Sequence, residues 1–169
     1  HVAQRIAHEK QHLQEVQAKR ELDEEEQELL DKLLTCTLEL FEQLSNDVER
    51  AKKILRSQAF YDIDQLEWAT NCLHQTMGVI SLGYYPAQIC FPPIETDIVY
   101  KPFMSSEIIE SLDDDQINIY RDVYDMLIRP VMERDRPQMV GISVVQQKQL
   151  IPTFTFCKMI KDAFPETHI

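Results

Sequence analysis

Mostly apolar side chains recur at alternating intervals of four and three residues between positions 30 and 55. The seam consists of Leu30, Leu34, Thr37, Phe41, Leu44, Val48, Ala51 and Leu55. This spacing places the seam on one side of a helix and predicts a long α-helix over about 28–56. Leu33, Leu40 and Ile54 widen the seam into a face, which favours a helical bundle over a two-stranded coiled coil. Residues 45–47 offer a break, with Asn46 as the cap of a second half.

A second helical signal begins at Asp64. Asp64 and Glu67 form a capping-box pattern, and apolar residues continue on one face, so a helix over 64–82 is predicted. Gly83 ends it. Residues 84–103 contain four prolines, which exclude a regular helix and predict an extended crossing segment.

Two further helices are predicted before the chain changes character. They cover 106–112 and 115–134, and Pro130 is expected to kink the second one. The predicted organisation is a helical segment over 1–135, followed by a different unit over 136–169.

The last segment has the order strand, loop, helix and strand. A β-branched run at 139–145 leads into a glutamine-rich loop, and an amphipathic helix then ends at Pro165. An extended segment begins again at 167–169, so we expect a βαβ unit that is cut off in its second strand. In open α/β sheets ligands bind at the carboxyl ends of the strands, which makes the loop after Val145 the first candidate for a ligand site. The expected fold is mostly α, with one to three strands.

Eight residues of this strand and loop are the candidate binding residues. Gly141 permits close approach of a ligand or of another backbone, and Ser143 and the glutamines offer uncharged hydroxyl and amide groups. Such groups suit a ligand rich in amides or ribose; the alternative is a helix cap followed by a solvated loop. The candidate residues are Gly141, Ser143, Val144, Val145, Gln146, Gln147, Gln149 and Leu150.

Residues 2–20 predict a polar helix, and the acidic run at 23–28 predicts a solvated face that can cap the helix after it. Within the first of these helices, His8, Glu9 and His12 match the HExxH pattern, which on a helix can bind zinc. The neighbouring side chains are polar, whereas a metalloprotease helix is buried, so a solvated helix is the favoured interpretation and zinc binding the alternative.

Other titratable residues predict structural roles. The Asp113-Asp114-Asp115 run lacks the glycine and the final glutamate of a calcium loop, so helix capping is favoured. His74 and His168 are solitary, and His74 is predicted to be a core or boundary residue rather than a ligand.

Charge and cysteine content narrow the functional classes. The formal net charge of -12 disfavours nonspecific binding to nucleic acid or to an anionic membrane. No apolar run approaches the roughly 18 residues that span a bilayer. The four cysteines are far apart and form no CxxC motif, which favours buried thiols in a cytoplasmic protein. Because the chain begins at His1 and shows no signal peptide, we expect a processed or truncated segment.

Three stretches of the sequence from residue 60 onwards carry a family resemblance. They are the strings FYDIDQLEWATNCLH and SLGYYPAQI and the whole of residues 105–169. Together they resemble the N-terminal region of cobalamin-binding radical S-adenosylmethionine enzymes. Ser143 stands where related cobalamin domains carry the serine of an S-x-L motif, which here reads Ser143-Val144-Val145. The matching residues are Pro137, Val140, Gly141, Ile142, Ser143, Val144, Gln149, Leu150, Ile151, Pro152, Lys158, Ile160, Lys161, Pro165 and Ile169.

The resemblance implies a partial Rossmann-like, doubly wound cobalamin-binding unit at the C-terminal end, with the loop after the first strand against the cofactor. It also implies a parent enzyme that catalyses methyl transfer or a radical cyclisation or rearrangement. The sequence has no CxxxCxxC motif, so the [4Fe–4S] cluster and S-adenosylmethionine would be bound in the radical domain of the parent chain, and this segment would not be catalytic alone. The D-x-H-x-x-G motif of some cobalamin domains is also absent.

A non-enzymatic role is the main alternative. In this interpretation the chain is a helical protein–protein interaction module, and the face at 30–55 contacts a partner or a second copy of the chain.

Overall fold

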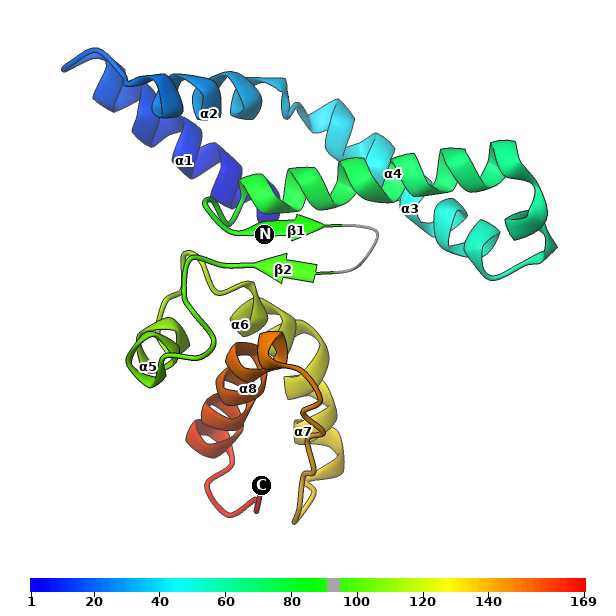
Figure 1. Ribbon diagram of the computed structural model, residues 1–169, viewed down its shortest axis with the longest axis vertical. Helices are drawn as coiled ribbons and strands as arrows, with labels where there is room; N and C mark the ends of the chain where they lie inside the picture. The colour runs from blue at the N-terminus through cyan, green and yellow to red at the C-terminus, as the bar shows by residue number, and fades with distance from the viewer. Residues whose placement is uncertain (91–94) are drawn as a thin grey trace. The chain divides into compact units, whose positions relative to one another are not determined.

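A computed structural model of the chain describes residues 1–90 and 95–169. These residues form a mostly α-helical protein with a small antiparallel sheet (Figure 1). The chain divides into two compact units, residues 1–97 and 98–169. The boundary between these units lies at 97/98 and not at the predicted 135/136, because the helices between 105 and 135 pack with the helix at 150–163.

The first unit begins with a pair of packed helices, α1 (Val2–Gln17) and α2 (Glu24–Thr35). α1 is polar, as predicted, and buries only Ile6 and Leu13. These two side chains form a core with Leu29, Leu30 and Leu33 of α2. The acidic run does cap the second helix: Asp23 and Glu26 form a reciprocal capping box, with hydrogen bonds of 2.9 and 3.0 Å.

The long helix expected over 28–56 is two helices, because α3 (Leu38–Leu55) begins separately after α2. Thr37 lies in an extended conformation, and its hydroxyl accepts a hydrogen bond from the Leu40 backbone N–H at 3.2 Å. Helix α3 then continues through residues 45–47, so the break expected there is also wrong. The restart falls at Thr37 because its side chain satisfies an N–H group that has no partner within the helix.

The divided seam is largely occupied by the chain's own helices. Leu30 and Leu33 contact the α1 core, while Ala51 and Ile54 of α3 pack with Ala69 and other residues of α4 (Ile63–Leu82). Self-association through this face is therefore not supported by the structure. Among the seam positions, Leu34 remains 45% exposed.

Helices α3 and α4 lie side by side and are linked by η1 (Gln58–Tyr61), a 3-10 turn (Figure 1). Asp62 rather than Asp64 caps α4, since its side chain accepts from the backbone N–H groups of Asp64 and Gln65 at 3.1 and 3.2 Å. Gly83 ends the helix, as predicted.

The extended segment expected over 84–103 contains a β-hairpin. Strand β1 (Gln88–Cys90) pairs antiparallel with β2 (Glu95–Asp97), with Ile89 opposite Thr96. Residues 91–94 of the expected segment lie outside the described residues.

The second unit begins with α5 (Ser105–Leu112), close to its predicted bounds. The helix predicted over 115–134 starts only at α6 (Ile119–Val123), then widens into a π-helical turn, η2 (Tyr124–Ile128), and continues as α7 (Arg129–Asp135). Proline has no backbone N–H and its ring crowds the carbonyl four residues earlier, so a wider turn before Pro130 lets the helix continue.

A buried polar cluster fixes the start of α6. The Asn118 side-chain amide donates to the Ser111 carbonyl at 2.8 Å and to the Thr155 hydroxyl at 2.9 Å. Its carbonyl oxygen accepts from the Tyr120 N–H at 3.1 Å. Ser111, Asn118 and Thr155 are all buried, so their hydrogen bonds connect α5, the start of α6 and the helix at 150–163.

The last segment consists of η3 (Gln147–Gln149), a 3-10 turn, and α8 (Leu150–Ala163). Met159 and Ile160 of α8 form the core of this unit with Tyr124 and Met132. The strand expected over 139–145 is not formed over that range, and in the described residues its place is taken by a single parallel bridge between Met139 and His168. A parallel sheet needs several paired residues on each strand, whereas this pairing is limited to one bridge. A Rossmann-like sheet is therefore not confirmed.

Candidate functional site

The eight residues predicted to bind a ligand lie in a loop of the second unit, in the η3 turn that follows it and, for Leu150, at the half-buried start of α8. Residues 143–149 are all exposed, and Val145 is exposed to 81%. A Cβ placed on Gly141 would meet nothing within 4 Å, so no close neighbour requires glycine there. The loop is thus accessible to a ligand, but no neighbouring atoms enclose it at Gly141.

Gln149 has a structural role in this loop. Its side-chain oxygen accepts from the backbone N–H groups of Val145 and Gln146 at 2.7 and 3.0 Å. Gln146 completes a capping arrangement with it at the start of η3. The alternative of a helix cap therefore accounts for these two glutamines, while Ser143 and Gln147 are exposed side chains outside that capping arrangement.

His8 and His12 are both exposed on α1. Within residues 1–90 and 95–169, no group of three or more His, Cys, Asp or Glu side chains is arranged to hold a metal ion. The zinc alternative therefore gains no third ligand from the structure.

The helix cap predicted at 113–115 is wrong, because α6 begins at Ile119 and Asn118 is its cap. Asp114 instead stabilises the turn that precedes Asn118. The Asp114 carboxylate accepts from the backbone N–H groups of Gln116 and Ile117 at 2.9 and 3.0 Å. It also accepts a hydrogen bond of 2.7 Å from the Tyr100 hydroxyl, which raises the pKa of Tyr100 to about 12. Asp113 and Asp115 pair with Lys158 and Arg121.

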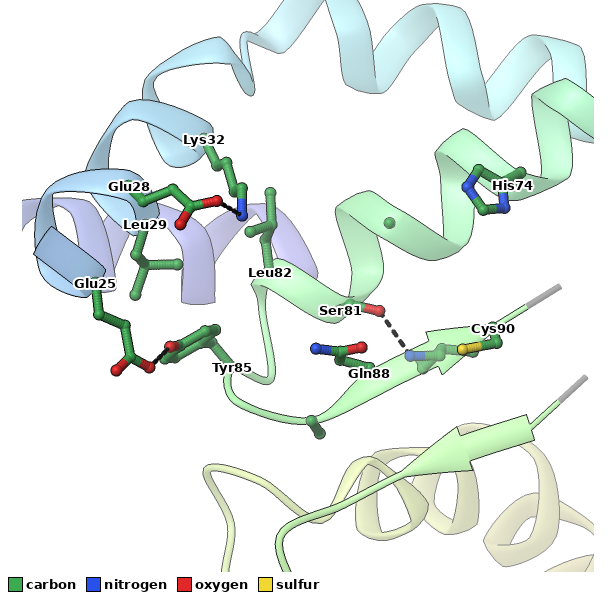
Figure 2. A pocket seen from close by; sticks show the side chains of 13 residues that line it. Glu25, Glu28, Leu29, Lys32, His74, Ser81, Leu82, Tyr85, Gln88 and Cys90 are labelled. Atoms are coloured by element: carbon green, nitrogen blue, oxygen red, sulfur yellow. Dashed lines mark hydrogen bonds and ion pairs between the residues drawn. The ribbon is translucent and has the colours of Figure 1, made fainter.

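A cavity that sequence reasoning missed lies in the first unit, between α2, the C-terminal half of α4 and β1 (Figure 2). Its volume is about 310 Å³. Apolar side chains and charged or hydrogen-bonding groups both line it. The lining residues are Glu25, Glu28, Leu29, Lys32, His74, Gly78, Ser81, Leu82, Tyr85, Ala87, Gln88, Ile89 and Cys90.

The wall of the cavity is held by a contact between α4 and β1. The Ser81 hydroxyl donates to the Met77 carbonyl within the helix at 2.8 Å and accepts from the Ile89 backbone N–H at 2.8 Å. This bond fixes β1 against the helix. Gly78 lies one turn before Ser81, and a Cβ placed on it would meet nothing within 4 Å, so the absence of a side chain there keeps the cavity open.

Two pairs set the electrostatics of the cavity rim. The Glu28 carboxylate and the Lys32 ammonium form an ion pair of 2.6 Å, which lowers the pKa of Glu28. The Tyr85 hydroxyl donates to the Glu25 carboxylate, and this bond, assisted by burial and nearby carboxylates, raises the pKa of Tyr85 to about 12.

A histidine and a cysteine line this cavity. His74 of α4 and Cys90 of β1 both line it, and both are exposed. The expectation that all four cysteines are buried holds for Cys72 but is wrong for Cys90. A glycine inside an amphipathic helix was the available sequence signal for a cavity, since helix interiors disfavour glycine.

None of the helices in the described residues is long and apolar enough to cross a membrane. Comparisons with protein-family models, with curated proteins and with solved structures found no match for this chain. A function is therefore inferred from the residue pattern and the geometry alone.

Proposed function

We propose that the chain is part of a cobalamin-dependent radical S-adenosylmethionine enzyme, and that residues 141–150 contribute to its cobalamin site. The parent reaction would be methyl transfer to an unactivated carbon or a radical cyclisation or rearrangement. One structural observation carries the proposal beyond the sequence pattern: the parallel bridge between Met139 and His168, which joins the two ends of the segment containing α8.

Two backbone hydrogen bonds form this bridge. The Val140 N–H donates to the His168 carbonyl at 2.8 Å, and the His168 N–H donates to the Gln138 carbonyl at 2.9 Å. Parallel pairing across a helical connection is what a βαβ unit requires. The observation supports the proposal because the exposed loop then follows the carboxyl end of the first extended segment, where α/β sheets bind ligands.

The chemistry of the loop fits a cobalamin. Ser143 and Gln147 offer a hydroxyl and an amide, which can hydrogen-bond the amide side chains at the edge of the cofactor without introducing charge. Val144 and Val145 are 43% and 81% exposed, and this apolar surface is suited to being covered by a macrocycle. When bound, cobalamin would supply the methyl or radical chemistry, and the residues of this chain would bind and orient it.

The other components of the reaction would come from the rest of the parent chain. The sequence has no CxxxCxxC motif, so the [4Fe–4S] cluster and S-adenosylmethionine belong in this proposal to a separate radical domain. A cytoplasmic location is part of the proposal and is supported by four cysteines that form no disulfide.

A titration with hydroxocobalamin, followed by visible absorbance, tests the proposal in the parent protein that contains this chain. We expect saturable binding that Ser143→Trp weakens at least tenfold, since the indole would fill the exposed loop. Ser106→Trp is the matched control, because it makes the same change at an exposed position of α5 in the same unit.

Helicity of each variant is measured by circular dichroism alongside binding. An unchanged affinity in Ser143→Trp, or no saturable binding by the folded parent protein, contradicts the proposal.

A further inference from the structure

The cavity between α2, α4 and β1 belongs to the first unit, and its residues are separate from the loop proposed for cobalamin. Its volume of about 310 Å³ is at the lower end of the roughly 300–1,000 Å³ range of small-molecule sites. Leu29, Leu82, Ala87 and Ile89 supply apolar surface within it. A cavity of this size and lining can hold a compact organic ring or chain.

The charges on the rim do not cancel. Glu28 is neutralised by Lys32, to which it is bound at 2.6 Å. Glu25 accepts its hydrogen bond from the Tyr85 phenol, which is neutral, and in the described part of the chain it forms no ion pair. One carboxylate therefore remains without a compensating cation beside an apolar surface, in a chain whose formal net charge is -12.

The groups are spread along the cavity. Figure 2 shows Glu25 and Tyr85 at one end and His74 and Cys90 at the other, with Leu82 between them. A ligand that satisfies this arrangement has a positive charge at one end and an apolar body behind it.

We propose that this cavity binds a small organic cation, namely a primary amine carried on a flat apolar body. The ammonium group lies at the Glu25 carboxylate and donates hydrogen bonds to it, and the apolar body covers Leu29 and Leu82. Gly78 leaves room for the body because no side chain projects from that position. The assignment does not depend on the proposed enzymatic function, since it uses only residues of the first unit.

The test compares two probes with the same indole body and opposite charge, tryptamine and indole-3-propionate. Binding to the full chain is followed by two-dimensional amide nuclear magnetic resonance. The sequence has three glycines, and Gly78 lines the cavity while Gly141 lies in the other unit, so their signals report the site and an internal control. We expect tryptamine to shift the Gly78 and Ile89 signals saturably. The concentration needed should be at least tenfold lower for tryptamine than for indole-3-propionate.

Two variants locate the ligand. Gly78→Leu should weaken tryptamine binding at least tenfold, because the leucine side chain fills the cavity; leucine also favours a helix, so the fold is retained. Glu25→Gln should weaken binding several-fold and remove the preference for the amine. Glu24→Gln is the matched control: it changes the net charge equally, in the same helical turn, at a residue that does not line the cavity.

Raising the salt concentration should weaken the binding of tryptamine more than that of indole-3-propionate, because an exposed carboxylate is screened. Three results would overturn the assignment: no saturable shift at Gly78 with tryptamine, equal binding of the two probes, or an equal effect of Glu24→Gln and Glu25→Gln. A parent protein that does not bind cobalamin would not contradict this assignment, because the cavity residues all belong to the first unit.

Discussion

Gly78 and Gly83 show how the surroundings of a residue decide its role. Gly78 lies inside α4, and a Cβ added to it meets nothing within 4 Å. Gly83 is the residue at the end of α4, and its added Cβ would lie 3.1 Å from the Cγ1 atom of Val2 in α1. The first glycine keeps a cavity open, whereas the second permits a close approach of two helices.

Replacing each glycine by alanine separates these two roles. Gly78→Ala should raise the free energy of unfolding of the first unit by about 0.5–1 kcal/mol, because alanine favours the helix interior. Gly83→Ala should raise this free energy less, or lower it, because the Val2 side chain must move to make room for the added Cβ. Urea unfolding followed by the fluorescence of Trp68, the single tryptophan, measures both. Equal stabilisation by the two changes would contradict this account.

At the scale of an element, the start of α4 depends on one carboxylate. Asp62 precedes the helix in an extended conformation and accepts from two backbone N–H groups, whereas Asp64 lies inside the first turn. Asp62→Ala should therefore lower the free energy of unfolding by about 1 kcal/mol. Asp64→Ala should cost only a few tenths, roughly what a charge near a helix N-terminus contributes.

Trp68 fluorescence during urea unfolding measures this pair as well, since Trp68 lies in α4. If Asp64→Ala proved the more damaging change, the cap would lie where the sequence pattern placed it.

The sequence predicted most helices but not their ends or their irregular turns. Apolar periodicity persists across residues 28–56, so it could not reveal that Thr37 starts a new helix. Pro130 predicted a kink, but the pattern did not show that a π-helical turn at 124–128 would accommodate the proline. β-branched residues predicted a strand at 139–145, but a strand also needs a partner, and here pairing is limited to one bridge at Met139.

Across the whole molecule, the two candidate sites differed in how far they could be predicted. The loop at 141–150 is continuous in the sequence, so its residue types were visible together. The cavity combines α2, α4 and β1, which are far apart in the sequence, and its open wall depends on a missing side chain at Gly78. Sequence patterns show the elements, but the packing of one element against another creates such a cavity.

In each unit a tyrosine hydroxyl donates a hydrogen bond to a carboxylate. In residues 1–97, Tyr85 bonds to Glu25, and in residues 98–169, Tyr100 bonds to Asp114. Both pKa values are raised to about 12, chiefly by these hydrogen bonds. An unfolded tyrosine ionises near pH 10, so the folded state of each unit holds this proton more tightly than the unfolded state does.

The alkaline stability of the molecule should reflect this difference. A raised pKa contributes stability that is fully present below about pH 10 and is lost as the pH rises towards about 12. The double variant Tyr85→Phe/Tyr100→Phe lacks both bonds, so its free energy of unfolding should fall less steeply over this interval than that of the unmodified chain. Urea unfolding at pH 8, 10 and 11, followed by circular dichroism, measures the two slopes. Tyr61→Phe, at a side chain that is 82% exposed, is the control for losing a phenol. Parallel slopes in the double variant and the unmodified chain would show that these hydrogen bonds do not couple folding to pH.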